Sequence, residues 1–173
     1  MTKKEFINAV ARGKTDVLQL FLDAVAQVGA DYCVVGGLAV NAYAEPVVSL
    51  DLDIVVAATD IEAVFAAVAK NFKVERFAHS VNLGSSESDL RIQLQTDSRY
   101  QGFIRKATTR NILGYEMKVA AKEDVLTGKI WAYSDEQRRM SKRQKDLADI
   151  ARLIEAYPEL GNNVPTEIRN KLK

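Results

Sequence analysis

The sequence predicts an α/β (α+β) fold in which helices flank a small mixed β-sheet. Short apolar runs typical of strands alternate with longer segments whose apolar residues recur at helical spacing. The chain has 173 residues, 47% of them hydrophobic, which is enough for one domain with a real core. We expect a single domain over residues 1–173, with N-terminal helices over 1–29, a core sheet over 30–120 and a helical part over 121–173.

Composition and charge exclude several classes of protein. The net charge is +1, so there is no global electrostatic case for binding nucleic acid or a membrane. The single cysteine, Cys33, lies in an apolar run and is expected to be a buried structural thiol. The single histidine, His79, excludes histidine-rich zinc sites. We find neither a signal peptide nor a long apolar span, and therefore expect a soluble, cytoplasmic protein.

The N-terminal segment, residues 3–28, predicts two helices that cover one side of the sheet. Its apolar residues recur at helical spacing, as in Val17, Leu18, Phe21, Leu22, Val25 and Val28. Gly13 separates a short first helix from a longer second one, and Gly29 ends the second.

Residues 32–56 predict a strand, a tight turn, a short helix and a second strand. The turn is the pair Gly36 and Gly37. Glycine has no Cβ and accepts positive φ, so another group can approach the backbone closely. The helix that follows points its free N–H groups at the same spot, which suits a phosphate. A glycine pair by itself is also compatible with a plain turn.

Asp51 and Asp53 lie in the second strand of this segment. Residues two apart in a strand face the same way, so the two carboxylates stand side by side while Leu52 points to the opposite face. Adjacent carboxylates repel unless a cation sits between them, and such oxygen ligands suit Mg²⁺. Alone, the pattern is equally typical of a solvated strand face; its position after the glycine pair makes it more specific.

The next segment predicts a helix, a strand and a loop. Thr59 and Glu62 have the spacing of a capping box, and the helix they start is expected to reach about Phe72. A short strand is expected over 73–77. Residues 80–88 are polar and contain glycine, which predicts a loop.

Residues 89–95 alternate strictly between polar and apolar side chains and predict a strand. Leu90, Ile92 and Leu94 are expected to face the core. The polar set faces the other side: Asp89, Arg91, Gln93 and Gln95.

The last third of the chain predicts a hairpin followed by helices. Residues 107–113 and 115–120, split by Gly114, indicate the hairpin. Residues 123–133 and 141–157 are helical, and the tail is expected to hold a short helix after Pro165.

The order of the motifs in residues 32–56 resembles the nucleotidyltransferase superfamily whose members share a DNA-polymerase-beta-like catalytic core. Residues 123–129 and 143–150 extend the resemblance and look like the abortive-infection (AbiE-type toxin) branch. The resemblance implies a polymerase-beta-like core with a helical C-terminal part. It also implies Mg²⁺-dependent transfer of a nucleoside monophosphate from a nucleoside triphosphate (NTP) to a hydroxyl acceptor.

Three functional classes stay open under this resemblance. The first is an enzyme acting on an RNA end, a protein or a small molecule. The second is the toxin of a toxin–antitoxin pair, with an antitoxin protein as partner. The third is a non-catalytic relative that binds nucleotide or a partner through a degenerate metal site.

The resemblance also assigns catalytic roles. Asp51 and Asp53 hold Mg²⁺, as one or two ions. Asp89 is the candidate for a third carboxylate that completes the metal site or accepts a proton; the alternative is a solvated aspartate at the head of its strand. If Asp89 is too far away, Gln93 occupies the position. Lys129 completes the catalytic set.

A further set of residues is expected to bind the nucleotide. Gly36, Gly37 and Ser49 cradle the triphosphate, and Lys129 and Lys145 neutralise it. Asp146 is expected to be partly buried and to orient a basic side chain, either Lys129 or Arg143 one helical turn back. The alternative for this basic segment is a helix-start ion pair that only stabilises the fold. The nucleotide-binding candidates are therefore Gly36, Gly37, Ser49, Lys129, Arg143, Lys145 and Asp146.

Overall fold

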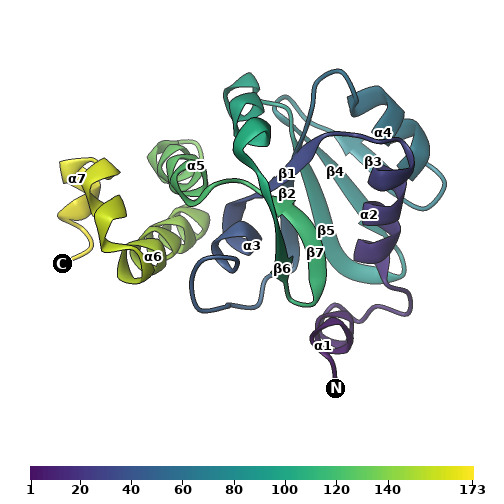
Figure 1. The fold of residues 1–173 in the computed structure, drawn as a ribbon, viewed down its shortest axis with the longest axis horizontal. Coiled ribbons are helices and arrows are strands. Elements are labelled where there is room, and N and C mark those ends of the chain that lie inside the picture. Colours follow the sequence, from purple (N-terminus) through teal and green to yellow (C-terminus); the bar gives the residue numbers. More distant parts are fainter.

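A computed structural model describes residues 1–173 and is organised around one mixed β-sheet (Figure 1). The strands are β1 (Tyr32–Val35), β2 (Asp51–Val56), β3 (Lys73–Arg76), β4 (Ser80–Ser85), β5 (Ser88–Gln95), β6 (Thr108–Ile112) and β7 (Tyr115–Val119). The α-helices are α1 (Lys3–Val10), α2 (Val17–Gln27), α3 (Gly36–Val40), α4 (Ile61–Val68), α5 (Lys122–Ser134), α6 (Met140–Ala156) and α7 (Thr166–Arg169). Two 3₁₀ helices complete the chain, η1 (Ser98–Lys106) and η2 (Pro158–Asn163).

The sheet has seven strands in the order β3-β4-β5-β2-β1-β7-β6. The pairs β2–β5 and β1–β7 are parallel and the remaining pairs are antiparallel, which confirms the predicted mixed sheet. β1 and β2 are antiparallel neighbours joined by the short helix α3. The glycine turn, Gly36 and Gly37, forms the first residues of α3 and meets the two aspartates of β2 at one end of the strand pair.

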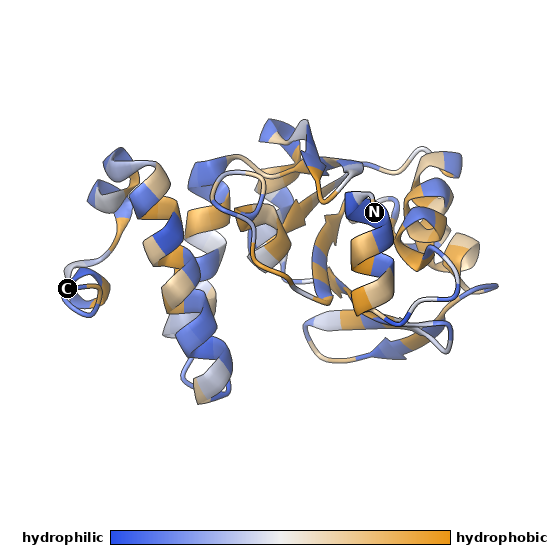
Figure 2. Cartoon of the chain, turned by 90° about the horizontal axis from the view of Figure 1, so that it is seen from below, coloured by the Kyte–Doolittle hydropathy of each residue, from blue (hydrophilic) through white to orange (hydrophobic).

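Helices cover the sheet on both sides (Figure 1). α2 and α4 lie on one side, and α3, α5 and α6 lie toward the other, with the C-terminus beyond them. One buried apolar cluster of 40 residues runs from α2 through the central strands to α5 and α6. The central strands are mainly hydrophobic in Figure 2. Cys33, in β1, is free and buried as expected, and burial raises the pKa of its thiol to about 12.

Three local predictions were wrong. Residues 80–88 are not a loop but include β4, because Val81 and Leu83 are buried in alternation with polar neighbours and pair with β3 and β5. The capping box at α4 does not form. Asp60 is the N-cap and its carboxylate accepts a hydrogen bond from the backbone N–H of Asp31 instead, at 2.9 Å. α4 also ends at Val68 rather than near Phe72.

No helix of the chain combines the length and the apolar character that crossing a membrane requires.

Candidate active site

A cavity of about 600 Å³ opens where the ends of β2 and β5 meet η1, α5 and the start of α6. Gly36, Asp51 and Asp53 line it on the sheet side. Lys129 of α5 and Lys142 of α6 line it on the helical side. Residues far apart in the sequence therefore converge at one place, and the cavity combines paired carboxylates with basic side chains.

Asp51 and Asp53 share one face of β2, as the strand period requires. The Oδ1 atom of Asp51 lies 2.8 Å from Nε of Arg91, and its Oδ2 atom lies 3.0 Å from Nζ of Lys142. Burial opposes ionisation of Asp51, but Lys142 and Arg91 outweigh it and lower its pKa. Both oxygens of Asp51 are thus engaged by cations of the chain itself.

The carboxylate of Asp53 forms no hydrogen bond and no ion pair. Burial raises the pKa of Asp53, and the neighbouring Asp51 carboxylate raises it further, against an opposing contribution from Lys129. A half-buried carboxylate without a partner is costly, so Asp53 favours a cation that enters the cavity.

Gly36 permits the close approach of the turn to Asp53. Its φ is +70°, a left-handed conformation that glycine adopts without strain. A Cβ at this position would overlap the Asp53 carboxylate. Val35, just before the turn, pairs directly with Asp53 across β1 and β2. The turn and the carboxylate are therefore packed against each other.

Replacing Gly36 by alanine is expected to weaken metal-dependent nucleotide binding by about 10–100-fold, the range for groups that hold a metal ligand in place. The new methyl group must push Asp53 aside, and the left-handed backbone adds about 1–2 kcal/mol of strain. Calorimetric titration with Mg²⁺ and a nucleoside triphosphate measures the effect. Gly84→Ala is the matched control because no atom lies within 4 Å of its added Cβ. Equal behaviour of the two variants would contradict this role of Gly36.

Lys129 is buried and lies between two carboxylates of α6. Its Nζ atom is 2.9 Å from Oδ1 of Asp146 and 2.7 Å from Oδ2 of Asp149. Burial works against the charged amine, but the two ion pairs outweigh it and raise the pKa of Lys129. The expected pairing of Asp146 with Lys129 is present, and Asp146 is more buried than expected, with 1% of its surface exposed.

Asp146 holds a second basic side chain. Nε of Arg138 donates to Oδ2 of Asp146 at 2.6 Å, and Arg138 lines the cavity. Arg138 and Lys142 are basic groups of the cavity that the site assignment from sequence omitted, as is Arg99 of η1. The sequence signal for Arg138 and Lys142 is the basic run that leads into α6. The prediction chose Arg143 and Lys145 from the same run instead.

Four nucleotide-binding candidates do not line the cavity. Lys145 is exposed on α6, whereas Lys142 shares a helical face with Asp146 and Asp149. Nε of Arg143 donates to the backbone carbonyl of Tyr133 at 2.7 Å. The hydroxyl of Ser49 accepts from the backbone N–H of Asp51 at 3.2 Å. Gly37 lies close to the ion pairs of Lys129, because a Cβ added at Gly37 would lie 3.6 Å from Oδ2 of Asp149.

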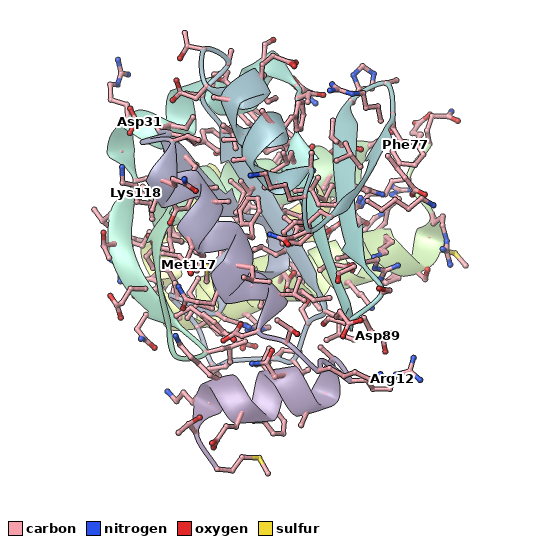
Figure 3. The ribbon with its side chains drawn as sticks, turned by 90° about the vertical axis from the view of Figure 1, so that its right-hand side faces the viewer. Arg12, Asp31, Phe77, Asp89, Met117 and Lys118 are labelled. Carbon is pink, nitrogen blue, oxygen red and sulfur yellow. The ribbon has the colours of Figure 1, made fainter.

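Asp89 also lies away from the cavity, which corrects the expected third carboxylate. In the parallel pairing of β2 with β5, Arg91 lies opposite Asp51 and Gln93 lies opposite Asp53. Asp89 is four residues before Gln93, about 13 Å along an extended strand. It forms an ion pair with Arg12, 2.5 Å away, beside the end of α1 (Figure 3). The residue beside Asp53 is the amide Gln93.

The donors of the cavity fit one divalent cation. Asp53 has no partner, Asp51 stands beside it, and the side chain of Gln93 forms no hydrogen bond within the chain. Two carboxylates and an amide oxygen are ligands that Mg²⁺ accepts, with further positions left for phosphate oxygens. No group of three or more acidic, histidine or cysteine side chains is placed to hold a metal. The site therefore has two carboxylates and lacks the third.

Comparison with known proteins finds solved structures of similar fold but no protein of similar sequence. No family model and no curated protein matches the chain. Among solved structures, the antibiotic-resistance factor ANT(2'')-Ia matches with a TM-score of 0.66 at 14% identity, covering 89% of this chain and 90% of that one. The lincosamide antibiotic adenylyltransferase LnuA, in its lincomycin-bound structure, matches with a TM-score of 0.57 at 13% identity, covering 82% and 99%.

A third match is an antigenic nucleotidyltransferase-like protein from Paracoccidioides brasiliensis. Its TM-score is 0.53 at 21% identity, covering 80% of this chain and 74% of that one. These likenesses define the fold: the chain has the fold of nucleotidyltransferases, as the resemblance of residues 32–56 had implied.

Proposed function

We propose that this chain transfers a nucleoside monophosphate from a nucleoside triphosphate to a hydroxyl acceptor. The observation that carries the proposal is the pair Asp51 and Asp53, side by side against the Gly36 turn in a cavity lined by Lys142 and Arg138. Paired carboxylates recruit a cation, and the basic side chains suit the triphosphate that accompanies it. The nucleotidyltransferase fold supports the same assignment.

The chain supplies binding, orientation and charge for an in-line displacement. The acceptor oxygen forms a bond to the α-phosphorus, and the bond from that phosphorus to the pyrophosphate breaks. Asp51 and Asp53, with Gln93, would hold Mg²⁺, which when bound offsets charge on the phosphate oxygens. Lys142 and Arg138 stabilise the leaving pyrophosphate. The hydroxyl proton passes to water, because the amide of Gln93 cannot accept it.

Lys129 and Asp146 act in this proposal as positioning residues. The Lys129 amine is already shared by two carboxylates, so its contribution is to fix α5 against α6. Asp146 accepts hydrogen bonds from both Lys129 and Arg138 and thereby orients Arg138 toward the cavity. The backbone of Gly36 and Gly37 offers the closest approach for the phosphates.

The test is a transfer assay with each of the four nucleoside triphosphates labelled at the α-phosphate, with Mg²⁺ and a cell extract. Label attached to an acceptor, and lost when EDTA is added, supports the proposal. Calorimetry with the same nucleotides and no acceptor reports binding separately. A protein that binds none of the four in the presence of Mg²⁺ would refute the proposed function.

Lys142→Ala is expected to separate metal binding from nucleotide binding. Without Lys142, the Oδ2 atom of Asp51 is free, so Mn²⁺ alone should bind roughly tenfold more tightly. Nucleotide binding in the presence of the metal should weaken by a similar factor, because one charge-assisted contact is lost. Titrations of Mn²⁺ and then of nucleotide measure both. Lys145→Ala, exposed on the same helix, should change neither the metal affinity nor the nucleotide affinity. A loss of nucleotide affinity in this variant would support the sequence-based assignment of Lys145 to the triphosphate.

A second candidate function is nucleotide or partner binding without transfer. The observation that favours it is Gln93, which stands beside Asp53 where the resemblance expects a carboxylate. Binding of Mg²⁺ and nucleotide with no labelled acceptor in any extract would favour this candidate.

The toxin role is a further proposal on the same site. Residues 143–150, which resemble the abortive-infection branch, contribute Asp146 and Asp149 to the Lys129 cluster. A toxin with this chemistry would modify a cellular acceptor and would need an antitoxin partner. Growth arrest on expression, lost in the Asp53→Asn variant, is the expected sign.

A further inference from the structure

Beyond Asp53, the sheet face that continues the cavity carries uncharged polar side chains. Gln93 on β5 lies opposite Asp53, and Asn82 on β4 lies opposite Gln93. Two residues further along, Ser80 lies opposite Gln95. Because residues two apart in a strand share a face, all four point to the same side as Asp53. We call Ser80, Asn82, Gln93 and Gln95 the polar bed.

The polar bed is unpaired within the protein. Its side chains are half-buried, yet none of them donates or accepts a hydrogen bond. Asn82 is the sharpest case, because its Oδ1 atom is buried and has no partner. Buried polar groups in folded proteins nearly always have a hydrogen-bond partner. Ser80, Gln93 and Gln95 line the cavity, where a ligand can reach them. A patch of unpaired amides and a hydroxyl, next to paired aspartates, therefore indicates a surface that a ligand completes.

Charges at this end of the cavity cancel. The carboxylate of Asp97 accepts from Nε of Arg99 at 2.9 Å and lies 2.7 Å from its Nη2. The guanidinium of Arg99 also lies flat over Trp131, 4.7 Å from the ring centroid. A polycationic ligand would need free carboxylates here, and a polyanionic one would need free cations. Asp53 is assigned to the metal by the proposed function, and the exposed Asp135 accepts from the backbone N–H of Gln137 at 3.0 Å. No other carboxylate of the cavity is without a partner, and each of its cations, Arg99, Arg138, Lys142 and Lys129, pairs with a carboxylate.

Tyr100 adds a neutral hydroxyl to the cavity wall. Its ring is held edge-on by Phe103 and Trp131, each with a centroid distance of 5.3 Å. The hydroxyl forms no hydrogen bond, and burial raises the pKa of Tyr100, so the group stays a neutral donor and acceptor. The cavity beyond the aspartates thus presents amides and hydroxyls on one side and an aromatic wall on the other.

We propose that the polar bed binds the acceptor, and that the acceptor is an uncharged, polyhydroxylated molecule such as a sugar. Vicinal hydroxyls both donate and accept, as the amide of Gln95 and the hydroxyl of Ser80 in the cavity lining do, so the two sets of groups can satisfy each other. The inference rests on the proposed function, because the bed begins at Gln93, directly beside Asp53. One acceptor hydroxyl would then lie at the aspartates while the remaining hydroxyls contact the bed.

The test offers three classes of acceptor to the whole protein with Mg²⁺ and the four α-labelled nucleoside triphosphates. The first pool contains neutral sugars and polyols, the second aminoglycosides, and the third short oligoribonucleotides. Label is expected in the neutral pool. Labelling of either other pool in preference, or no label in the neutral pool while nucleotide still binds, overturns the inference and leaves the proposed function standing. Failure to bind nucleotide at all refutes both.

Variants of the polar bed add a second readout. Gln95→Leu should raise the KM for the labelled acceptor about tenfold and leave the nucleotide Kd unchanged, because Gln95 lies two residues beyond the metal position. Ser80→Ala should have the same effect on KM, because Ser80 lines the cavity opposite Gln95. Asn82→Leu should raise the Tm by about 2–4 °C, because an unpaired buried oxygen is removed. Gln144→Leu, exposed on α6, is the matched control. An unchanged acceptor KM in both Gln95→Leu and Ser80→Ala would overturn the assignment of the bed.

Discussion

The Asp53→Asn variant is expected to lose nucleotidyl transfer by roughly 10³-fold and to lose metal-dependent nucleotide binding, with the fold intact. Asp53 is the one carboxylate of the cavity without a partner in the chain, so a bound cation would stabilise its charge the most. An amide keeps the shape of the side chain but removes the charge that attracts the metal. Calorimetric titration of Mg²⁺ with nucleotide, and the label-transfer assay, measure the two losses.

The same variant should be more stable than the parent in EDTA. Burial and the nearby Asp51 both disfavour the charged form of Asp53, so replacing it with a neutral amide relieves repulsion when no metal is present. Thermal melts with and without EDTA report the difference. Asp89→Asn is the matched control, because Asp89 sits on the neighbouring strand but pairs with Arg12 outside the cavity. Loss of transfer in Asp89→Asn, with Asp53→Asn unaffected, would reverse the assignment of the site.

The core of the site could be predicted because its signals are local. The glycine turn, the short helix and the two aspartates lie within residues 32–56, where strand period and turn chemistry fix which side chains face together. The alternation in residues 89–95 also predicted the inward and outward faces of β5 correctly. Local patterns therefore predicted both strands that carry the site, β2 and β5.

What could not be predicted depends on register between strands. Whether Asp89 or Gln93 stands beside Asp53 is decided by the offset of β5 against β2, and a strand pattern specifies which face a residue is on but not how far along it pairs. The number of possible strand pairings falls only when β4, whose glycine and serines are typical of a loop, is known to extend the sheet. The choice of Lys142 over Lys145 similarly depends on which face of α6 meets the cavity.

Lys129→Met is expected to destabilise the protein by about 3–5 kcal/mol, the range for removing one partner from a buried ion pair. The lysine is 7% exposed and serves Asp146 and Asp149 at once, so its loss leaves two neighbouring carboxylates without their shared cation. Urea unfolding measures the change. Lys118→Met provides the contrast. Lys118 pairs with Asp31 at the surface (Figure 3), where the loss should stay below about 1 kcal/mol.

The double variant Lys129→Met with Asp146→Asn identifies the cause of that loss. If the penalty comes from unpaired buried charge, neutralising one carboxylate should recover part of the stability, so the two substitutions would be non-additive. The recovery should be partial, because Asp149 keeps Arg152 as a partner, 2.7 Å away, while Arg138 loses the charge of Asp146. Nucleotide affinity should fall in the double variant, where Arg138 loses the carboxylate that orients it. Unchanged stability of Lys129→Met together with lost nucleotide binding would instead make Lys129 a direct phosphate ligand.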